Sequence, residues 1–256
     1  MKRIALGLTG CFAMQIATAG VYVELVEHDI RTDSTSLLQK MYVQGGSGRF
    51  VDDGGRSSLI KGDTMYIIDD SDKSYIVFDK ATMEQLAVKI KAMREQMKEQ
   101  LAKLPPEQRA QMEQLMGGGE EGAAYTIDAV DTGKSDNVEG RACKVWDIKR
   151  NGELDDQYCV VAFAQLPGKE NFQAVFASFA KVFEEMAQSV PMLSGVMTNE
   201  FGALSKVNGY PMRIRQYEKG KLDSIEQIVK VWREETIPAS MFEIPADYKR
   251  KTMPVE

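Results

Sequence analysis

The sequence has a single histidine, His28, among 256 residues. One imidazole excludes metal sites built from several histidines and leaves one candidate for the commonest general base. The chain also has no excess of positive charge, because 38 acidic residues outweigh 32 Lys and Arg and give a formal net charge of −6. A general nucleic-acid-binding protein needs a basic surface, so that class is excluded.

Long apolar runs are missing as well. After the first 20 positions, no stretch of about 20 residues is free of charges, so we expect no transmembrane segment in the mature chain. Apolar residues nevertheless make up 43% of the sequence and charged residues 27%. This composition supplies a hydrophobic core and excludes wholesale disorder.

The N-terminus has the layout of a secretory signal peptide. Lys2 and Arg3 form a short basic region, residues 4–16 are largely apolar, and residues 17–19 read Ala-Thr-Ala. Small residues of this kind mark a cleavage site. We therefore expect cleavage near Ala19 and a periplasmic or secreted mature chain.

A second processing route is the alternative. Residues 8–11 read Leu-Thr-Gly-Cys and resemble a lipoprotein box, in which Cys11 carries the lipid. Only a minimal apolar stretch precedes Cys11, and the apolar character continues past it, so cleavage near Ala19 is the preferred prediction.

Two cysteines remain after cleavage, Cys143 and Cys159. An even pair in an exported protein predicts a disulfide. The two cysteines lie in a predicted hairpin around residues 150–152. A two-residue turn places the two sulfurs on opposite faces, whereas a three-residue loop with Gly152 in a left-handed bulge position places Cys143 directly opposite Cys159. We expect the second register.

Alternating apolar residues predict strands, and apolar residues three or four apart predict helices. One long amphipathic helix begins near residue 81 and ends before Pro105, and a second runs from Pro106 to Met116, so residues 81–119 predict an inserted helical hairpin. A stripe from Phe172 to Met186 predicts a buried helix. We expect an α+β fold with one domain over residues 20–256.

The predicted strands are 21–30, 36–43, 49–51, 56–60, 64–68, 74–78, 124–130, 141–149, 153–161, 210–219, 222–233 and 241–244.

The long helix carries a methionine-rich apolar face. Packing against a core explains this face, because methionine fills irregular apolar space. Thioethers also suit Cu(I), and a soft surface for an apolar ligand is a further alternative. We predict no metal and no cofactor, and name six residues of this face as candidate ligand contacts: Met83, Leu86, Ile90, Met93, Met97 and Leu101.

The same helix is locally basic in an acidic chain. This charge favours an anionic membrane surface, but a solvated helix face explains it too and is the preferred interpretation. The residues concerned are Lys89, Lys91, Arg94, Lys98 and Lys103 against Glu84, Glu95 and Glu99.

Other candidate sites have simpler explanations. The acidic segments 52–53 and 69–72 lack the ligand spacing of a calcium-binding loop, so we expect solvated turns. His28 lies between Glu27 and Asp29 in a predicted strand, where a surface position is the default. No Ser/His/Asp or Cys/His constellation can be assembled, and we predict that the protein is not an enzyme.

The order of these parts resembles a family of bacterial envelope proteins of unknown function whose domain is similar to the LolA/LolB lipoprotein carriers. The segments that carry the resemblance are DTMYIID at 63–69, SYIVFD at 74–79, the inserted Met/Gln/Lys helix, GRAC at 140–143 and FEIP at 242–245. The resemblance implies a curved antiparallel β-sheet, or half-barrel, with helices on its concave face. Known carriers of that shape hold acyl chains, but no carrier functional residue matches a position here.

These observations lead to two functional hypotheses. The first is an exported non-enzymatic protein that binds or carries an apolar ligand such as lipid or acyl chains. The second is a structural or partner-binding envelope protein that uses the hairpin at 81–119 to dock another protein.

Overall fold

The computed structural model describes residues 19–105, 108, 126–189, 203–204 and 206–252. The expected export signal, including Cys11, lies outside these residues except for Ala19. The expected second arm of the helical hairpin, residues 106–116, also lies outside them apart from Gln108. The prediction of a single domain over 20–256 stays a prediction.

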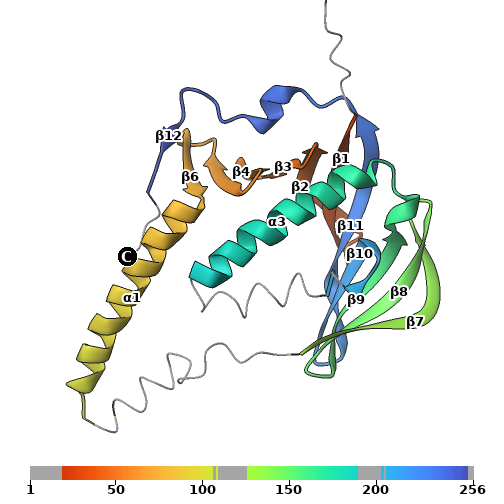
Figure 1. The fold of residues 1–256 in the computed structure, drawn as a ribbon. Helices are drawn as coiled ribbons and strands as arrows, with labels where there is room; N and C mark the ends of the chain where they lie inside the picture. The colour runs from red at the N-terminus through yellow and green to blue at the C-terminus, as the bar shows by residue number, and fades with distance from the viewer. Residues whose placement is uncertain (1–18, 106–107, 109–125, 190–202, 205, 253–256) are drawn as a thin grey trace, which may run out of the picture.

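Within the described residues, twelve strands form one large open sheet that is accompanied by two α-helices (Figure 1). The large antiparallel sheet expected from the alternating pattern is therefore confirmed. The strands are β1 (Gly20–Asp29), β2 (Ser34–Gln44), β3 (Ser47–Asp52), β4 (Arg56–Lys61), β5 (Thr64–Asp69), β6 (Ser74–Phe78), β7 (Ile127–Val138), β8 (Arg141–Arg150), β9 (Glu153–Ala162), β10 (Gly209–Glu218), β11 (Lys221–Glu235) and β12 (Lys249–Arg250). The helices are α1 (Lys80–Ala102) and α3 (Lys169–Ser189), with short 3₁₀ helices η1 (Phe163–Gln165) and η3 (Ala239–Phe242).

The strand order is β12-β6-β5-β4-β3-β2-β1-β11-β10-β9-β8-β7. β1 to β6 form a meander, because each strand pairs with the next through a short connection. The pairing of β1 with β11 joins this meander to the later strands, with Gly20 opposite Glu235. β12 is the exception to the antiparallel pattern and pairs with β6 in parallel.

The β7–β8 end of the sheet curls strongly toward β10 and β11. Asp136 on β7 and Arg213 on β10 form an ion pair although β8 and β9 lie between their strands. On a flat sheet three strand spacings amount to about 14 Å, which these two side chains do not bridge. The β7–β8 turn reaches β11 as well, because Glu139 pairs with Lys230 at 2.7 Å.

Helix α3 packs against the face of the sheet that carries the largest buried cluster. Its Phe172 stacks on Trp232 of β11 with the ring centroids 4.4 Å apart, and the edge of Tyr210 of β10 approaches within 5.4 Å. Val175 contributes to the same cluster together with Val21 and Val23 of β1. The helix expected from the stripe at Phe172 is therefore present and is buried at Phe172 and Val175, whereas the side chains of Phe183 and Met186 lie outside the described ones.

The opposite face of β2 to β6 is covered by the chain that follows β11. Ile237 and Phe242 from this segment bury Leu59 of β4 and Ile68 of β5. Arg49 of β3 donates from Nη1 to the carbonyl of Met241 at 3.5 Å. The segment then reaches the β6 edge, where β12 pairs with it (Figure 1). The N-terminal half of the sheet is consequently buried on both faces.

Some element boundaries differ from the sequence prediction. The segment 241–244, expected as a strand, falls at the end of η3 instead, because it lies over a sheet face and has no free sheet edge to join. β7 begins at Ile127 and runs on to Val138, beyond the predicted end at 130. An irregularity between Asp131 and Ser135 interrupts the alternation there and hides the second half of the strand from pattern reading.

Candidate functional site

The apolar face of α1 is the first candidate site, and it begins at a capped helix end. Asp79 precedes the helix and accepts a hydrogen bond from the backbone N–H of Thr82 at 2.8 Å. This cap fixes where the helix starts and thereby orients its first turn against β6. Met83, one turn in, is 2% exposed and packs with Ile60, Met65 and Val182.

The six predicted ligand contacts separate into two groups along α1. Leu86 and Ile90 are partly buried against the same cluster as Met83, so the structure brings these three together. Met93 is 39% exposed. Met97 and Leu101, on the following turns, are intermediate in exposure. The first group packs against side chains of α3 and the sheet, and the second group follows on later turns of α1, a helix that extends past the end of α3 (Figure 1).

The two helices are attached to the sheet in different ways. α3 is held by hydrogen bonds and an ion pair: Asn171 accepts from the backbone N–H of Gly45 at 2.9 Å, and Lys181 pairs with Asp63 at 2.5 Å. Among the described residues, Arg250 donates a hydrogen bond to the hydroxyl of Thr82 at the start of α1, at 3.3 Å. In the same part of the chain, α1 packs against a core cluster through Met83, Leu86, Ala87 and Ile90. The cover formed by α1 therefore rests mainly on apolar contacts.

A second candidate site is a charged cluster around Glu226, which the sequence patterns did not predict. Glu226 lies on β11 and is 6% exposed. Its carboxylate accepts from Arg215 Nε at 2.7 Å and approaches Arg213 Nε at 3.7 Å. Burial acts to raise the pKa of Glu226, but the hydrogen bonds from Arg215 and His28 outweigh it, and the pKa is lowered. Glu226 is therefore ionised at neutral pH.

His28 completes this cluster from β1. Its Nδ1 lies 3.1 Å from Glu226 and its Nε2 lies 3.0 Å from Asp33. Hydrogen bonds to Glu226 and then to Asp33 raise the pKa of His28 above 6.5. Because both ring nitrogens face carboxylates, neither is available in this arrangement to activate a nucleophile or ligate a metal.

One sequence signal points to this cluster. Arg213 and Arg215 stand two apart in a strand, which places both guanidinium groups on one face of the sheet. Two arginines on a half-buried face require an acidic partner. The partner, Glu226, lies between Ile225 and Gln227 on β11, and only the pairing of β10 with β11 identifies it.

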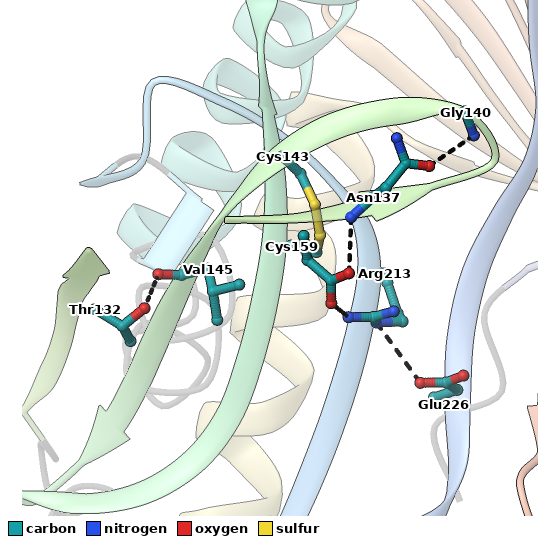
Figure 2. The surroundings of a disulfide bond; sticks show 9 residues. Thr132, Asn137, Gly140, Cys143, Val145, Cys159, Arg213 and Glu226 are labelled. Carbon is teal, nitrogen blue, oxygen red and sulfur yellow. Dashed lines mark hydrogen bonds and ion pairs between the residues drawn. A yellow bond between two sulfur atoms is a disulfide. The ribbon is translucent and has the colours of Figure 1, made fainter. Parts of the chain in front are cut away.

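The disulfide between Cys143 and Cys159 is confirmed, but the predicted hairpin register is wrong (Figure 2). The turn has two residues, Asn151 with φ 52° and Gly152 with φ 84°, as in a type I′ turn. A bulge between Ile148 and Lys149 then shifts the pairing, so that Val145 faces Cys159. This shift returns both sulfurs to one face, because Cys143 lies two residues from Val145.

The disulfide joins the curled end of the sheet to the charged cluster. Cys143 is the register partner of Asp136 on β7, and Cys159 is the register partner of Arg213 on β10. Asp136 and Arg213 form an ion pair with each other, and Figure 2 shows that Arg213 also points toward Glu226. The hydrogen bond from Arg213 holds the pKa of Asp136 below its usual value. Five adjacent strands are cross-linked by these contacts.

Two structural observations bear on metal and membrane chemistry. Across the described part of the chain, no three His, Cys, Asp or Glu side chains are grouped as metal ligands. In that same part, none of the helices combines the length and apolar character needed to cross a bilayer.

Comparison with known families gives one match. A family model described as a domain of unknown function, DUF4412, covers residues 111–248, which is more than half of the chain. The chain belongs to the DUF4412 family. The DUF4412 region contains both cysteines, Arg213, Arg215 and Glu226, whereas α1 and His28 lie outside it. A search of curated proteins finds no match.

Proposed function

We propose that this protein is an exported, non-enzymatic protein that binds an apolar ligand, such as a lipid acyl chain, between α1 and the sheet. The observation that carries the proposal is the different attachment of the two helices. α3 is attached to the sheet by a hydrogen bond of Asn171 and an ion pair of Lys181. The described contacts of α1 with the apolar face are mainly the packing of Met83, Leu86 and Ile90. Apolar contacts can be exchanged for contacts with an acyl chain at little cost.

The chemistry of this layer suits a flexible hydrocarbon chain. Met65 of β5 and Met83 of α1 meet in it, and methionine side chains adapt to irregular apolar shapes. Each methylene transferred from water into such a layer contributes about 0.8 kcal/mol. The resemblance to LolA/LolB carriers supports the same ligand class.

Export is part of the proposal. The disulfide between Cys143 and Cys159 is typical of proteins that fold in an oxidising compartment. The signal-like residues 1–19 support delivery to the periplasm or secretion. Mass spectrometry of the protein from cells tests this point, because cleavage near Ala19 gives an unmodified N-terminus at Gly20. A lipid on Cys11 identifies the lipoprotein alternative instead.

Ligand binding is tested on gently purified protein and on protein stripped of lipid. We expect native mass spectrometry to show bound lipid in the first sample, and the second sample to take up a fluorescent fatty acid. Protein that arrives empty and takes up no fatty acid contradicts the proposal.

Two variants locate the ligand. Leu86→Asp places a charge in the apolar layer and is expected to abolish fatty-acid uptake, whereas Val88→Asp, at a position that is 69% exposed on the same helix, is the matched control. Leu86→Trp keeps the face apolar but fills it, and should weaken uptake in a protein that still folds. Uptake that is unchanged in both Leu86 variants overturns the proposed site.

A docking role for the segment 81–119 is the second candidate. It is favoured by the exposure of Val88 and Met93 on α1, at 69% and 39%. Deletion of 81–119 distinguishes the two candidates. Loss of a co-purifying envelope protein, with fatty-acid uptake retained, favours docking, and loss of uptake favours the carrier.

A further inference from the structure

The second half of α1 leaves the body of the protein. Among the described side chains, Ile90 is the last one of α1 that packs against a core cluster, and Figure 1 shows the helix continuing past the end of α3 and away from the sheet. Met93, on the next turn, is 39% exposed. About three helical turns, up to Ala102, therefore extend beyond the sheet with an apolar stripe that is partly open to solvent.

The charges on these turns are not scattered. With 3.6 residues per turn, Ile90, Met93, Met97 and Leu101 fall within an arc of about 80° around the helix axis. Lys89 lies on one side of this stripe, and Lys91 and Lys98 lie on the other, each about 80–120° from its centre. Glu95 and Glu99 are about 160° from the centre, on the far side of the helix.

The lysines are also available for an external partner. Lys89, Lys91 and Lys98 are all exposed. Among the residues that the structure describes, Lys91 and Lys98 have no carboxylate within ion-pair distance. Their charge stands out from that of the whole chain, which carries a formal −6.

This arrangement matches the interface of an anionic phospholipid bilayer. A helix lying in that interface buries its apolar stripe among the acyl chains, while lysines beside the stripe extend their ammonium groups to the phosphates. The acidic residues then face the water, away from the negative surface. A solvated helix face has no such requirement for lysines beside the stripe and glutamates opposite it.

We propose that the turns of α1 from Lys89 to Ala102 dock the protein along the surface of an anionic phospholipid membrane. The docking is independent of acyl-chain binding, because it uses Met93, Met97, Lys91 and Lys98 rather than the buried Met83 and Leu86. Docking brings the protein to a membrane from which the apolar ligand is collected, or to which the ligand is delivered.

Vesicle co-sedimentation of the purified full chain tests the docking. We expect binding to vesicles of phosphatidylcholine mixed with phosphatidylglycerol, little binding to phosphatidylcholine alone, and a loss of binding at high salt. Each lysine near an anionic surface contributes about a five-fold change in affinity. The double variant Lys91→Glu and Lys98→Glu should therefore bind at least about 25-fold more weakly.

The matched control reverses two exposed lysines elsewhere. Lys134→Glu on β7 together with Lys221→Glu on β11 changes the net charge by the same amount and should leave vesicle binding unchanged. Equal loss in both double variants means that net charge alone governs binding and overturns the proposal. Unchanged binding of the Lys91/Lys98 variant overturns it as well.

The apolar half of the surface has its own variant. Met93→Ser together with Met97→Ser should weaken vesicle binding. Leu86→Asp, which is expected to abolish fatty-acid uptake, should leave vesicle binding unchanged, and this result separates docking from the carrier function. A lipid-free dimer that the double methionine variant dissociates, together with no binding to anionic vesicles, identifies a self-association surface and overturns the proposal.

Discussion

Arg215 on β10 and Glu226 on β11 are register partners, and Arg215 Nε lies 2.7 Å from Glu226 Oε2. On the other side of Glu226, the register partner on β1 is His28. The buried carboxylate of Glu226 is thus shared between His28 of β1, which is early in the chain, and two arginines of β10, which is late in the chain. This arrangement is the basis of the first three predictions below.

Removal of the Glu226 carboxylate should destabilise the fold. Glu226→Ala leaves Arg213, Arg215 and His28 without their shared partner, and we expect a loss of about 2–4 kcal/mol, below the full effect for a buried pair because the arginines are partly exposed. Equilibrium unfolding in urea with the disulfide intact measures the change. Glu235→Ala on the same strand, which breaks a surface ion pair with Arg233, is the control and should cost less than about 1 kcal/mol. Equal effects of the two variants would show that the cluster contributes no more than a surface pair.

The protonation of His28 should be visible directly, because it is the single histidine of the chain. Its pKa is raised above 6.5 by Glu226 and Asp33, so its ring signals in NMR should titrate above that value. In Glu226→Gln and Asp33→Asn the titration should move back toward 6.5. A wild-type pKa at or below 6.5 would contradict the geometry of this cluster.

The same shift predicts a pH dependence of stability. The folded pKa of His28 is higher than the unfolded pKa near 6.5, so its stabilising effect is fully present below 6.5 and is lost as the pH rises through the folded pKa. We therefore expect urea midpoints to fall over that window, and the fall to be smaller in His28→Gln. The carboxylate of Glu226 acts in the opposite sense, because its stabilisation is lost only as the pH falls from about 4.5 through its lowered folded pKa. A slope that His28→Gln leaves unaltered above pH 6.5 would assign it to other groups.

The disulfide should stabilise the curled end of the sheet. Cys143 and Cys159 are 16 residues apart, and closure of a loop of that size contributes about 3 kcal/mol in the chain-entropy account. The double variant Cys143→Ser and Cys159→Ser should lose about 2–3 kcal/mol in urea unfolding. Non-reducing peptide mapping of the wild-type protein should recover the two cysteines in one linked peptide pair. Free thiols at both positions would refute the link.

The anchoring of α1 can be measured at two methionines on one helix. Met83 is 2% exposed, so Met83→Ala removes buried volume and should cost about 2–4 kcal/mol. Met93 is 39% exposed, and Met93→Ala should change stability by no more than about 0.5 kcal/mol. Thermal or urea unfolding of both variants gives the comparison. A large effect at Met93 would mean that the second half of α1 is packed against the protein, which would also weaken the membrane-docking proposal.

Local patterns were enough to predict the hairpin of β5 and β6, with its turn at 70–73, and the start of α1. Alternation and helical periodicity depend on neighbours a few residues apart, so the sequence carries them directly. The cysteine pair was predicted correctly because two cysteines remain in the expected mature chain. Its register was not, because the bulge beside Lys149 adds one residue that no alternation pattern reveals.

The sequence by itself determined most of the strands, the two main helices, the disulfide partners and the amphipathic face of α1, since each depends on residue type and short spacing. Only the tertiary structure decided that His28 and Glu226, 198 residues apart, would meet. It also decided that Met83 is buried while Met93 is not. The pairing of β1 with β11 joins segments far apart in the chain, and it forms because the two strands bury apolar residues together. How much of α1 the core covers depends on the packing of the sheet and α3, which no pattern of neighbouring residues encodes.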